Sequence, residues 1–436
     1  MNHKTKYKNP FQGMTQFIFL WATQAFSTLG SSMTSYALVI WSYQQTGSAL
    51  STALLTICSY APYVLLSIFA GALTDRWNKK YTMLICDSFA AVCTVIIWFL
   101  SHTGQLMIWH LYLLNTLNGL MNTIQQPASD VSISLLTPRD QYQRASGMRS
   151  FSNSLVTLLT PMIATVLLSF WGLTTVIAFD LITFGVAFTA LALYIKIPEP
   201  QTSSHHRSSV LETAKEGIVY LKHNRGILDL ILFLAAINLT ASMFNAALPA
   251  LLLSREGGSE AALGLVNACT GLANIAGSLF AAFSPPPNSR VKAICAALLF
   301  SMSTENFLLA FGRNLGIWCL GAILGWLAMP VMNSNMDVLF RTRIPLEMQG
   351  RVYSVRNTLQ FFTIPIGYLL GGIFVDKIFE PLLSSQPPDS ILALIFGSEK
   401  GSGAAFLFLI LGFMGMLTCL IFQRDRHIWR LEEKDM

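Results

Sequence analysis

The sequence predicts an all-α membrane protein in which twelve transmembrane helices form two six-helix bundles related by a parallel pseudo-two-fold repeat. Three observations predict this fold class: the composition, the number of long apolar runs, and a pattern repeated in the two halves. Of the 436 residues, 53% are hydrophobic and only 11% are charged, whereas a soluble domain carries about 25% charged residues. A transmembrane helix needs about 20 apolar residues, so the chain has room for about twelve. A soluble globular protein and a single-pass receptor do not fit these numbers.

Apolar runs separated by charged residues, glycine or proline are the expected membrane helices. The first run is too long for a signal peptide, is interrupted by Gln24 and lacks a small-residue cleavage pattern, so we expect it to be the first membrane helix. The runs cover 14–43, 48–74, 81–101, 105–135, 142–170, 172–196, 227–253, 261–284, 291–311, 315–340, 348–378 and 402–423.

The longest polar connection lies between the sixth and seventh runs. We therefore expect an N-terminal six-helix bundle over 1–196, a cytoplasmic linker over 197–226 and a C-terminal six-helix bundle over 227–436. Within the linker, 211–221 has an amphipathic pattern, and a short surface helix is expected over 391–396.

The basic residues predict the orientation of the chain. With twelve crossings both termini lie on one side, and if that side is the cytoplasm, 24 of the 28 Lys and Arg residues are cytoplasmic. Positive charge accumulates in cytoplasmic loops of membrane proteins, so we expect both termini to be cytoplasmic. The four basic residues expected outside are Arg255, Arg313, Lys377 and Lys400.

Several classes of function are excluded or disfavoured. The seven cysteines lie in apolar runs without a CxxC pair, so no disulfide framework or metal site is expected. The net charge of +6 is explained by cytoplasmic loops, so no nucleic-acid partner is expected. No nucleotide-binding P-loop, HExxH or GxSxG motif is present, so the chain is not expected to be an enzyme and needs no cofactor. The energy for transport is then expected to come from an ion gradient or from the gradient of the substrate itself.

A pattern of an acid, a proline turn and arginines occurs in both halves at a spacing of 207 residues. Six helices separate the copies, so both have the same orientation, as in a parallel repeat. We interpret the charged residues as ionic latches between helices at the cytoplasmic ends; the alternative is anchoring of the topology by positive charge. The residues are Asp130, Arg144 and Arg149 in the first copy and Asp337, Arg351 and Arg356 in the second.

The connection between the second and third helices resembles the loop signature of the major facilitator superfamily: a small residue, a leucine, an Asp-Arg pair and a basic pair. Asn78 stands where the family pattern has glycine. The resemblance implies alternating-access transport, in which this motif acts in the conformational change. The residues that carry it are Gly71, Leu73, Asp75, Arg76, Lys79 and Lys80.

The resemblance extends to the bacterial macrolide-efflux and drug:proton antiporter branch of the superfamily. Asp87, Asp180, 46–49, 215–217 and 350–354 carry it. It implies a monomer in the bacterial cytoplasmic (inner) membrane that exports amphipathic molecules, with membrane lipids as its surroundings and the proton gradient as its energy source. Antiporters of the superfamily usually have a Gly-Pro pair followed by glycines in the fifth helix. Here Thr160, Pro161 and Ala164 keep only the proline, which leaves the direction of transport open.

Amides and hydroxyls form stripes on four of the expected helices. Asn115, Asn118 and Asn122 are spaced by three and four residues and share one helix face. The resemblance places helices 1, 4, 7 and 10 around the pathway and implies a cavity role; the alternative is amide hydrogen bonding between helices. No Lys or Arg lies in the middle of a helix, which disfavours an anionic substrate. The other candidate cavity residues are Gln24, Thr28, Ser31, Asn238, Asn245, Trp326 and Asn333.

Three acids lie inside expected membrane helices: Asp87, Asp180 and Glu305. A carboxyl group in a low-dielectric site can carry a proton, as a proton-coupled carrier requires. We interpret them as candidates for proton coupling; the alternative is a hydrogen-bonded acid that fixes packing. The resulting hypothesis is proton-coupled export of amphipathic drugs or metabolites. The alternative is a proton-coupled importer or a facilitator of a neutral metabolite such as a sugar.

Overall fold

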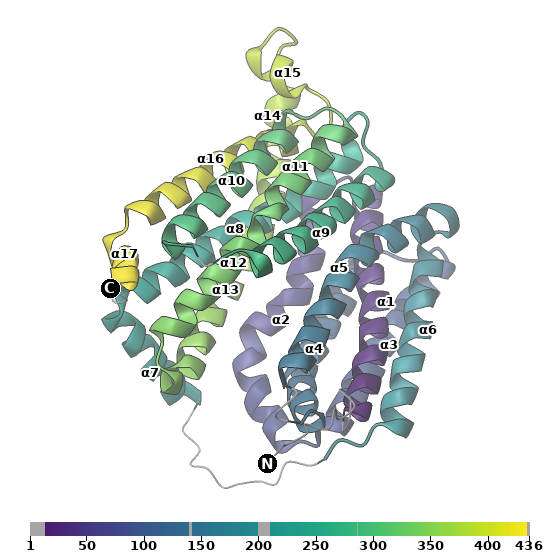
Figure 1. Ribbon diagram of the computed structural model, residues 1–436. Helices are drawn as coiled ribbons and strands as arrows, with labels where there is room; N and C mark the ends of the chain where they lie inside the picture. The colour runs from purple at the N-terminus through teal and green to yellow at the C-terminus, as the bar shows by residue number, and fades with distance from the viewer. Residues whose placement is uncertain (1–13, 139–141, 199–209, 286, 434–436) are drawn as a thin grey trace.

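The protein is a bundle of long helices (Figure 1). The computed structural model describes residues 14–138, 142–198, 210–285 and 287–433, and within these ranges every regular element is a helix. Ten of the described helices or helix pairs are long and apolar enough to cross a membrane. The prediction of an all-α membrane protein is confirmed.

The first group of helices lies before the central connection and follows the sequence prediction to within about three residues at each end. α6 continues into η2, a π-helical turn. The elements are α1 (Thr15–Thr46), α2 (Ala49–Arg76), α3 (Lys79–His102), α4 (Ile108–Leu136), α5 (Tyr142–Trp171), α6 (Leu173–Thr189) and η2 (Ala190–Tyr194).

The second group follows the amphipathic helix α7 (Val210–His223), which lies where the linker pattern predicts it. The short surface helix also forms as predicted, as α15. The elements are α8 (Arg225–Ser254), α9 (Glu260–Phe283), α10 (Arg290–Phe311), α11 (Leu315–Leu327), α12 (Met329–Arg343), α13 (Leu346–Ile373), η3 (Phe374–Phe379), α14 (Glu380–Ser384), α15 (Ile391–Phe396), α16 (Ser402–Arg424) and α17 (Arg426–Glu433).

One expected helix is broken, and two short helices, α14 and α17, were not predicted. The run 315–340 forms α11 and α12, separated at Ala328, because Pro330 has no backbone N–H to donate to the turn before it. The C-terminal helix α17 is short and charged, which hides it from an apolar-run search. It is held by Ile428, which is buried, and by Glu432, which accepts from the backbone N–H of Val291 at 2.8 Å.

Short polar side chains set several helix boundaries. Asn78 caps α3 by accepting from the N–H of Tyr81 at 3.1 Å, so the residue that replaces the family glycine has a local structural role. Ser259 and Ser289 cap α9 and α10 in the same way. Gly47 ends α1 with φ +60, where its N–H donates to the carbonyl of Tyr43.

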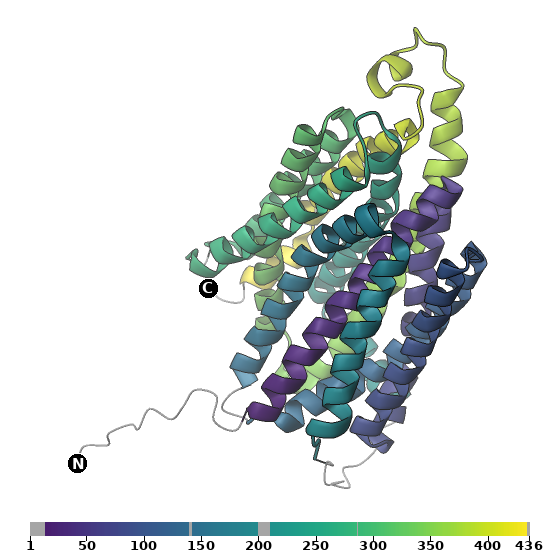
Figure 2. The ribbon, with the colours of Figure 1, turned by 90° about the vertical axis from the view of Figure 1, so that its right-hand side faces the viewer.

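The two groups pack mainly within themselves and meet along two helix crossings. α1 packs against α5 and α6, and α2 and α3 pack against α4; in the second group α8 packs against α13, and α10 against α16. The main crossings between the groups are α2 with α13 and α5 with α9; α8 also meets α1 and α2, and η3 meets α2. We call the end of the bundle that carries Gly47 and α15 the α15 end, and the opposite end, near Lys196 and Val210, the linker end (Figures 1 and 2).

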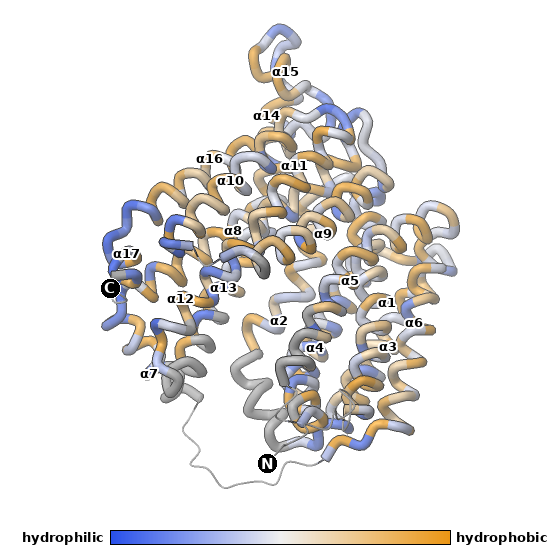
Figure 3. Tube along the Cα trace, viewed as in Figure 1, coloured by the Kyte–Doolittle hydropathy of each residue, from blue (hydrophilic) through white to orange (hydrophobic). Residues whose placement is uncertain are grey.

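The bundle exposes apolar side chains, as a lipid-facing surface requires. Leu193, Phe170, Ile182, Phe280 and Ile421 are each more than 60% exposed. Figure 3 shows apolar residues along the helices and polar residues concentrated near helix ends and in the C-terminal segment. Soluble monomers rarely expose apolar area on this scale, so the surface supports a membrane protein.

Candidate functional site

The amide stripe of α4 lies in the first half of the helix, and its three members differ in exposure. Asn122 is exposed, whereas Asn115 and Asn118 are half-buried. The side-chain oxygen of Asn118 is buried and has no hydrogen-bond partner among the residues that the structure describes. Buried polar atoms are nearly always hydrogen-bonded, so this oxygen still needs a partner, which a water molecule or a movement of α4 would supply.

The other candidate cavity residues differ in their surroundings. Asn245 on α8 and Asn333 on α12 are exposed, and Asn238 and Gln24 are half-buried. Thr28 is exposed, and its hydroxyl donates to the carbonyl of Gln24 one turn earlier, at 2.8 Å. The remaining two candidates, Ser31 and Trp326, are hydrogen-bonded to acids.

Each of the three membrane acids accepts a hydrogen bond from a side chain of a neighbouring helix. Asp180 on α6 is 4% exposed and accepts from the hydroxyl of Ser31 on α1 at 2.9 Å. Glu305 on α10 is 7% exposed and accepts from the indole N–H of Trp326 on α11 at 3.0 Å. Asp87 on α3 accepts from Gln125 on α4. The acids therefore attach α6 to α1, α10 to α11 and α3 to α4. In each pair the second helix carries candidate cavity residues.

Glycines make room for two of these acids. A Cβ atom at Gly30 would lie 2.2 Å from the hydroxyl oxygen of Thr183 and 3.0 Å from the Cα of Asp180, so α1 and α6 are in backbone contact at this level. A Cβ atom at Gly325 would lie 2.5 Å from a carboxylate oxygen of Glu305. Small residues let membrane helices approach closely, and here they bury a carboxyl group between two helices.

The repeated charged pattern forms equivalent ion pairs in both halves. Arg149 on α5 lies 2.8 Å from Asp130 on α4, and Arg356 on α13 lies 3.9 Å from Asp337 on α12. The Arg356 guanidinium also stacks on the ring of Phe340 at 4.4 Å. Both pairs join neighbouring helices of one group. These two contacts therefore fix the helices of each group at the linker end.

The loop motif is only partly described. Lys80 donates to the carbonyls of Ala192 and Ile195 at 2.9 and 2.8 Å, which stabilises the end of η2 as a cation does at a helix C-terminus. Lys79 is buried and donates to the carbonyl of Trp77 at 3.0 Å. The side chains at Gly71, Leu73, Asp75, Arg76, Arg144 and Arg351 lie outside the described residues.

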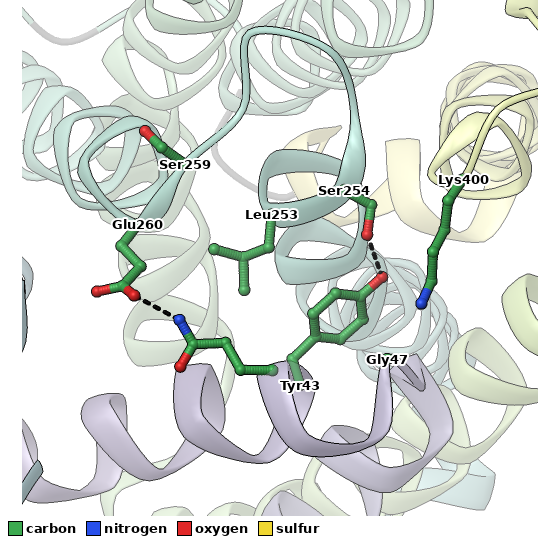
Figure 4. Close-up of a pocket in the computed structure, with 8 residues that line it drawn as sticks. Tyr43, Gly47, Leu253, Ser254, Ser259, Glu260 and Lys400 are labelled. Carbon is green, nitrogen blue, oxygen red and sulfur yellow. Dashed lines mark hydrogen bonds between the residues drawn. The ribbon is translucent and has the colours of Figure 1, made fainter.

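A polar cluster at the α15 end was not predicted from the sequence. The hydroxyls of Tyr43 on α1 and Ser254 on α8 are 2.6 Å apart, and Gln44 donates to Glu260 on α9 (Figure 4). These side chains line a pocket of about 520 Å³ that also includes Lys400. They occur singly next to helix ends, so no spacing in the sequence identifies them as a group.

Together, the all-helical bundle, the apolar outer surface and the polar side chains within it define a polytopic membrane transport protein. The chain belongs to the Major Facilitator Superfamily, whose sequence profile matches residues 20–368. It is a transporter and not an enzyme, and the resemblance drawn from the loop motif is confirmed.

Relatives and solved structures agree with this assignment. Macrolide efflux protein A of Streptococcus pyogenes is 24% identical over 368 residues, covering 83% of this chain and 90% of the relative. The transporter YfiS of Bacillus subtilis is 22% identical over 389 residues, covering 84% and 88%. The POT family transporter PepTSo has a TM-score of 0.70 at 12% identity, covering 97% of this chain and 99% of that chain. The nucleoside transporter NupG has a TM-score of 0.66 at 11% identity, covering 94% and 98%.

Proposed function

We propose that this protein is an alternating-access secondary transporter that exports amphipathic drugs or metabolites from the bacterial cytoplasm in exchange for protons. It acts as a monomer in the cytoplasmic (inner) membrane, surrounded by lipids, and needs no cofactor beyond the proton gradient. A small amphipathic molecule is its substrate.

The proposed architecture has twelve crossings. α1 and α4 are 32 and 29 residues long, enough to span a bilayer, and with the ten more apolar spans they make twelve. Polar stripes lower their hydropathy, as expected for helices that face a pathway instead of lipid. The two groups then correspond to bundles over 1–196 and 227–436 joined by the linker 197–226, and the repeated ion pairs support a parallel repeat.

Twelve crossings leave both termini on the linker side. The excess of basic residues in the segments on that side supports its placement in the cytoplasm. The α15 end is then the outer end. All hydrogen bonds between described residues that join the two groups lie toward this end, including those of Tyr43 and Asp376. These bonds support our proposal that the outer side is closed in this structure.

The attachment of the three membrane acids, of which Asp180 and Glu305 are buried, to pathway helices carries the proposal of proton coupling. None of the three forms an ion pair with a described residue, and their partners are neutral. An ionised carboxylate in such a place carries a desolvation cost of several kcal/mol, so gain or loss of a proton changes the energy of the site substantially. The protonation state can thus bias the position of α1, α4 or α11.

The chemistry of the pathway helices supports an amphipathic substrate. Amides on α4 and α8 offer hydrogen bonds without a fixed charge, and no Lys or Arg stands among them. The relatives from Streptococcus pyogenes and Enterococcus faecalis bear the name macrolide efflux protein, which supports a large amphipathic compound as the first to test.

The amide stripe gives a prediction about substrate affinity. Asn118→Leu keeps the size of the side chain and removes the unpartnered oxygen, so we expect the KM for the exported compound to rise about tenfold, the equivalent of about one hydrogen bond. Initial rates of transport against substrate concentration measure this change. Thr116→Val on the same helix is the control, because this hydroxyl is bonded to the carbonyl of Tyr112. An unchanged KM in Asn118→Leu would remove this residue from the binding site.

Transport direction separates the proposal from its alternative. Inverted vesicles that contain the protein should accumulate an amphipathic drug when their interior is acidified, and the accumulation should collapse with a protonophore. The alternative function, import or facilitated uptake of a neutral metabolite such as a sugar, is favoured by the loss of the glycines after Pro161. It predicts uptake into right-side-out vesicles and no drug accumulation in inverted ones.

A further inference from the structure

The first turn of α2 is held by a carboxylate from the other group of helices. The N–H groups at the start of a helix have no partner within the helix. Here the N–H of Ala49 donates to one oxygen of Asp376 at 3.0 Å, and the N–H of Leu50 donates to the other at 2.8 Å. The hydroxyl of Ser48 donates to the same carboxylate. A charged acceptor at this position is stabilised by the hydrogen bonds and by the helix dipole.

This contact joins segments that are far apart in the sequence. Asp376 lies in η3, a π-helical turn at the α15 end of α13, and is 326 residues from Leu50. Such turns are rare and concentrate at functional sites. One turn earlier, a Cβ atom at Gly372 would lie 2.7 Å from the Cα of Leu50, so only glycine permits this approach of α13 to α2.

A second carboxylate also joins the two groups at the α15 end. Glu260, in the first turn of α9, accepts from Gln44 on α1 and from Ser169 on α5, the latter at 3.3 Å. The two acids therefore hold three helices of the first group, and both contacts lie at the end proposed to face outward. Neither can persist if the two groups separate there.

We infer that Asp376 is the latch of an outer gate: its carboxylate caps α2 while the outer side is closed and releases the helix when that side opens. The inference rests on the proposed alternating-access function. Opening exposes three donors that lose a charged acceptor at once, so the carboxylate favours the closed state. Substitution of the carboxylate by a neutral amide shifts the balance toward the outward-open state.

Glu380 provides a matched control within the same region. Its two carboxylate oxygens accept from the N–H groups of Gly401 and Gly403 at 2.6 and 2.7 Å, which caps α16 as Asp376 caps α2. α16 belongs to the same group as Glu380, so this cap does not span the gate. Glu380→Gln removes a helix cap of the same chemistry, and these two hydrogen bonds of Glu380 both stay within the second group.

The test measures the distance across the outer end of the full-length protein in lipid. Spin labels are placed by Gln105→Cys and Glu256→Cys, two exposed positions on outer connections of opposite groups, after the native cysteines are replaced. Double electron–electron resonance then gives the populations of short and long distances. Asp376→Asn should raise the ratio of long to short about 5- to 30-fold, whereas Glu380→Gln should leave it as in the parent.

A second variant keeps the test decisive if Asp376→Asn does not fold. Gly372→Ala places a methyl group against the backbone of Leu50 and should also enlarge the long-distance population. The inference is overturned if Asp376→Asn folds and keeps the parental distribution, or shifts it no more than Glu380→Gln. If Asp376→Asn does not fold, a parental distribution in Gly372→Ala overturns it. A parent that shows a single distance with and without drug and proton gradient would instead contradict alternating access itself.

Discussion

Asp180→Asn should greatly reduce proton-driven transport while the protein remains folded and still binds its substrate. The carboxyl group is buried between α6 and α1 and accepts a hydrogen bond from the hydroxyl of Ser31. Ser31 is exposed and lies on α1, one of the predicted pathway helices. Asparagine keeps the acceptor oxygen and cannot exchange a proton. Coupling between two ligands of a protein is typically about 5- to 150-fold, so gradient-driven accumulation should fall by about 10- to 100-fold. Drug accumulation in inverted vesicles with and without a proton gradient measures the loss.

Exchange without a gradient distinguishes lost coupling from lost binding. Asp180→Asn should still exchange labelled for unlabelled drug across the membrane at equilibrium. Asp87→Asn and Glu305→Gln test the other two acids in the same assay, and Ser31→Ala tests the hydrogen bond alone. If drug accumulation still depends fully on the proton gradient in Asp180→Asn and loses this dependence in Glu305→Gln, the coupling acid is Glu305 on α10. Asp180 would then have only a packing role.

Gly119→Leu should strongly destabilise the folded protein. α4 and α2 are in backbone contact at this glycine, where a Cβ atom would lie 2.2 Å from the carbonyl oxygen of Ser59 and 3.0 Å from its carbonyl carbon. A side chain cannot rotate away from a backbone atom, so the two helices must separate. We expect a destabilisation of about 3 kcal/mol, at the upper end of the range for overpacked sites. Thermal unfolding of the purified protein in detergent, followed by size-exclusion chromatography, measures it.

Gly185→Ala is the control for this substitution. Gly185 lies inside α6, and a Cβ atom there meets nothing within 4 Å. Alanine is the better helix former by about 1 kcal/mol, so this variant should unfold at the same temperature as the parent or a higher one. A parental unfolding temperature in Gly119→Leu would show that α2 and α4 are not in contact at Gly119.

The sequence predicts the helices well because their signal is local. Apolar runs and their polar interruptions place the ends of α1 to α6 to within about three residues, and the amphipathic pattern places α7. The break at Ala328 was missed because a proline at the first turn of a helix is compatible with a continuous apolar run. The charged helix α17 has no apolar run, and only its packing on α8 reveals it.

The candidate site is less predictable, since its contacts join distant segments. The sequence shows that Asp180 lies in a membrane helix, but its partner Ser31 is 149 residues away. The spacing of 207 residues relates Asp130 to Asp337 and Arg149 to Arg356, and in the structure each acid forms an ion pair with the arginine of its own copy. Asp376 occurs in no repeat or motif, and its role as a cap on α2 follows only from three-dimensional contact.

Exchange of protons for drug is the central claim, and purified protein tests it most directly. The unmodified chain is reconstituted into liposomes with a pH-sensitive dye inside, an acidic interior is imposed, and an amphipathic drug such as a macrolide is added outside. The account predicts that drug accumulates inside while the interior becomes less acidic, and that Asp180→Asn liposomes show neither change. Drug uptake at the same rate with and without the pH gradient, and without proton movement, would contradict it and favour a facilitator.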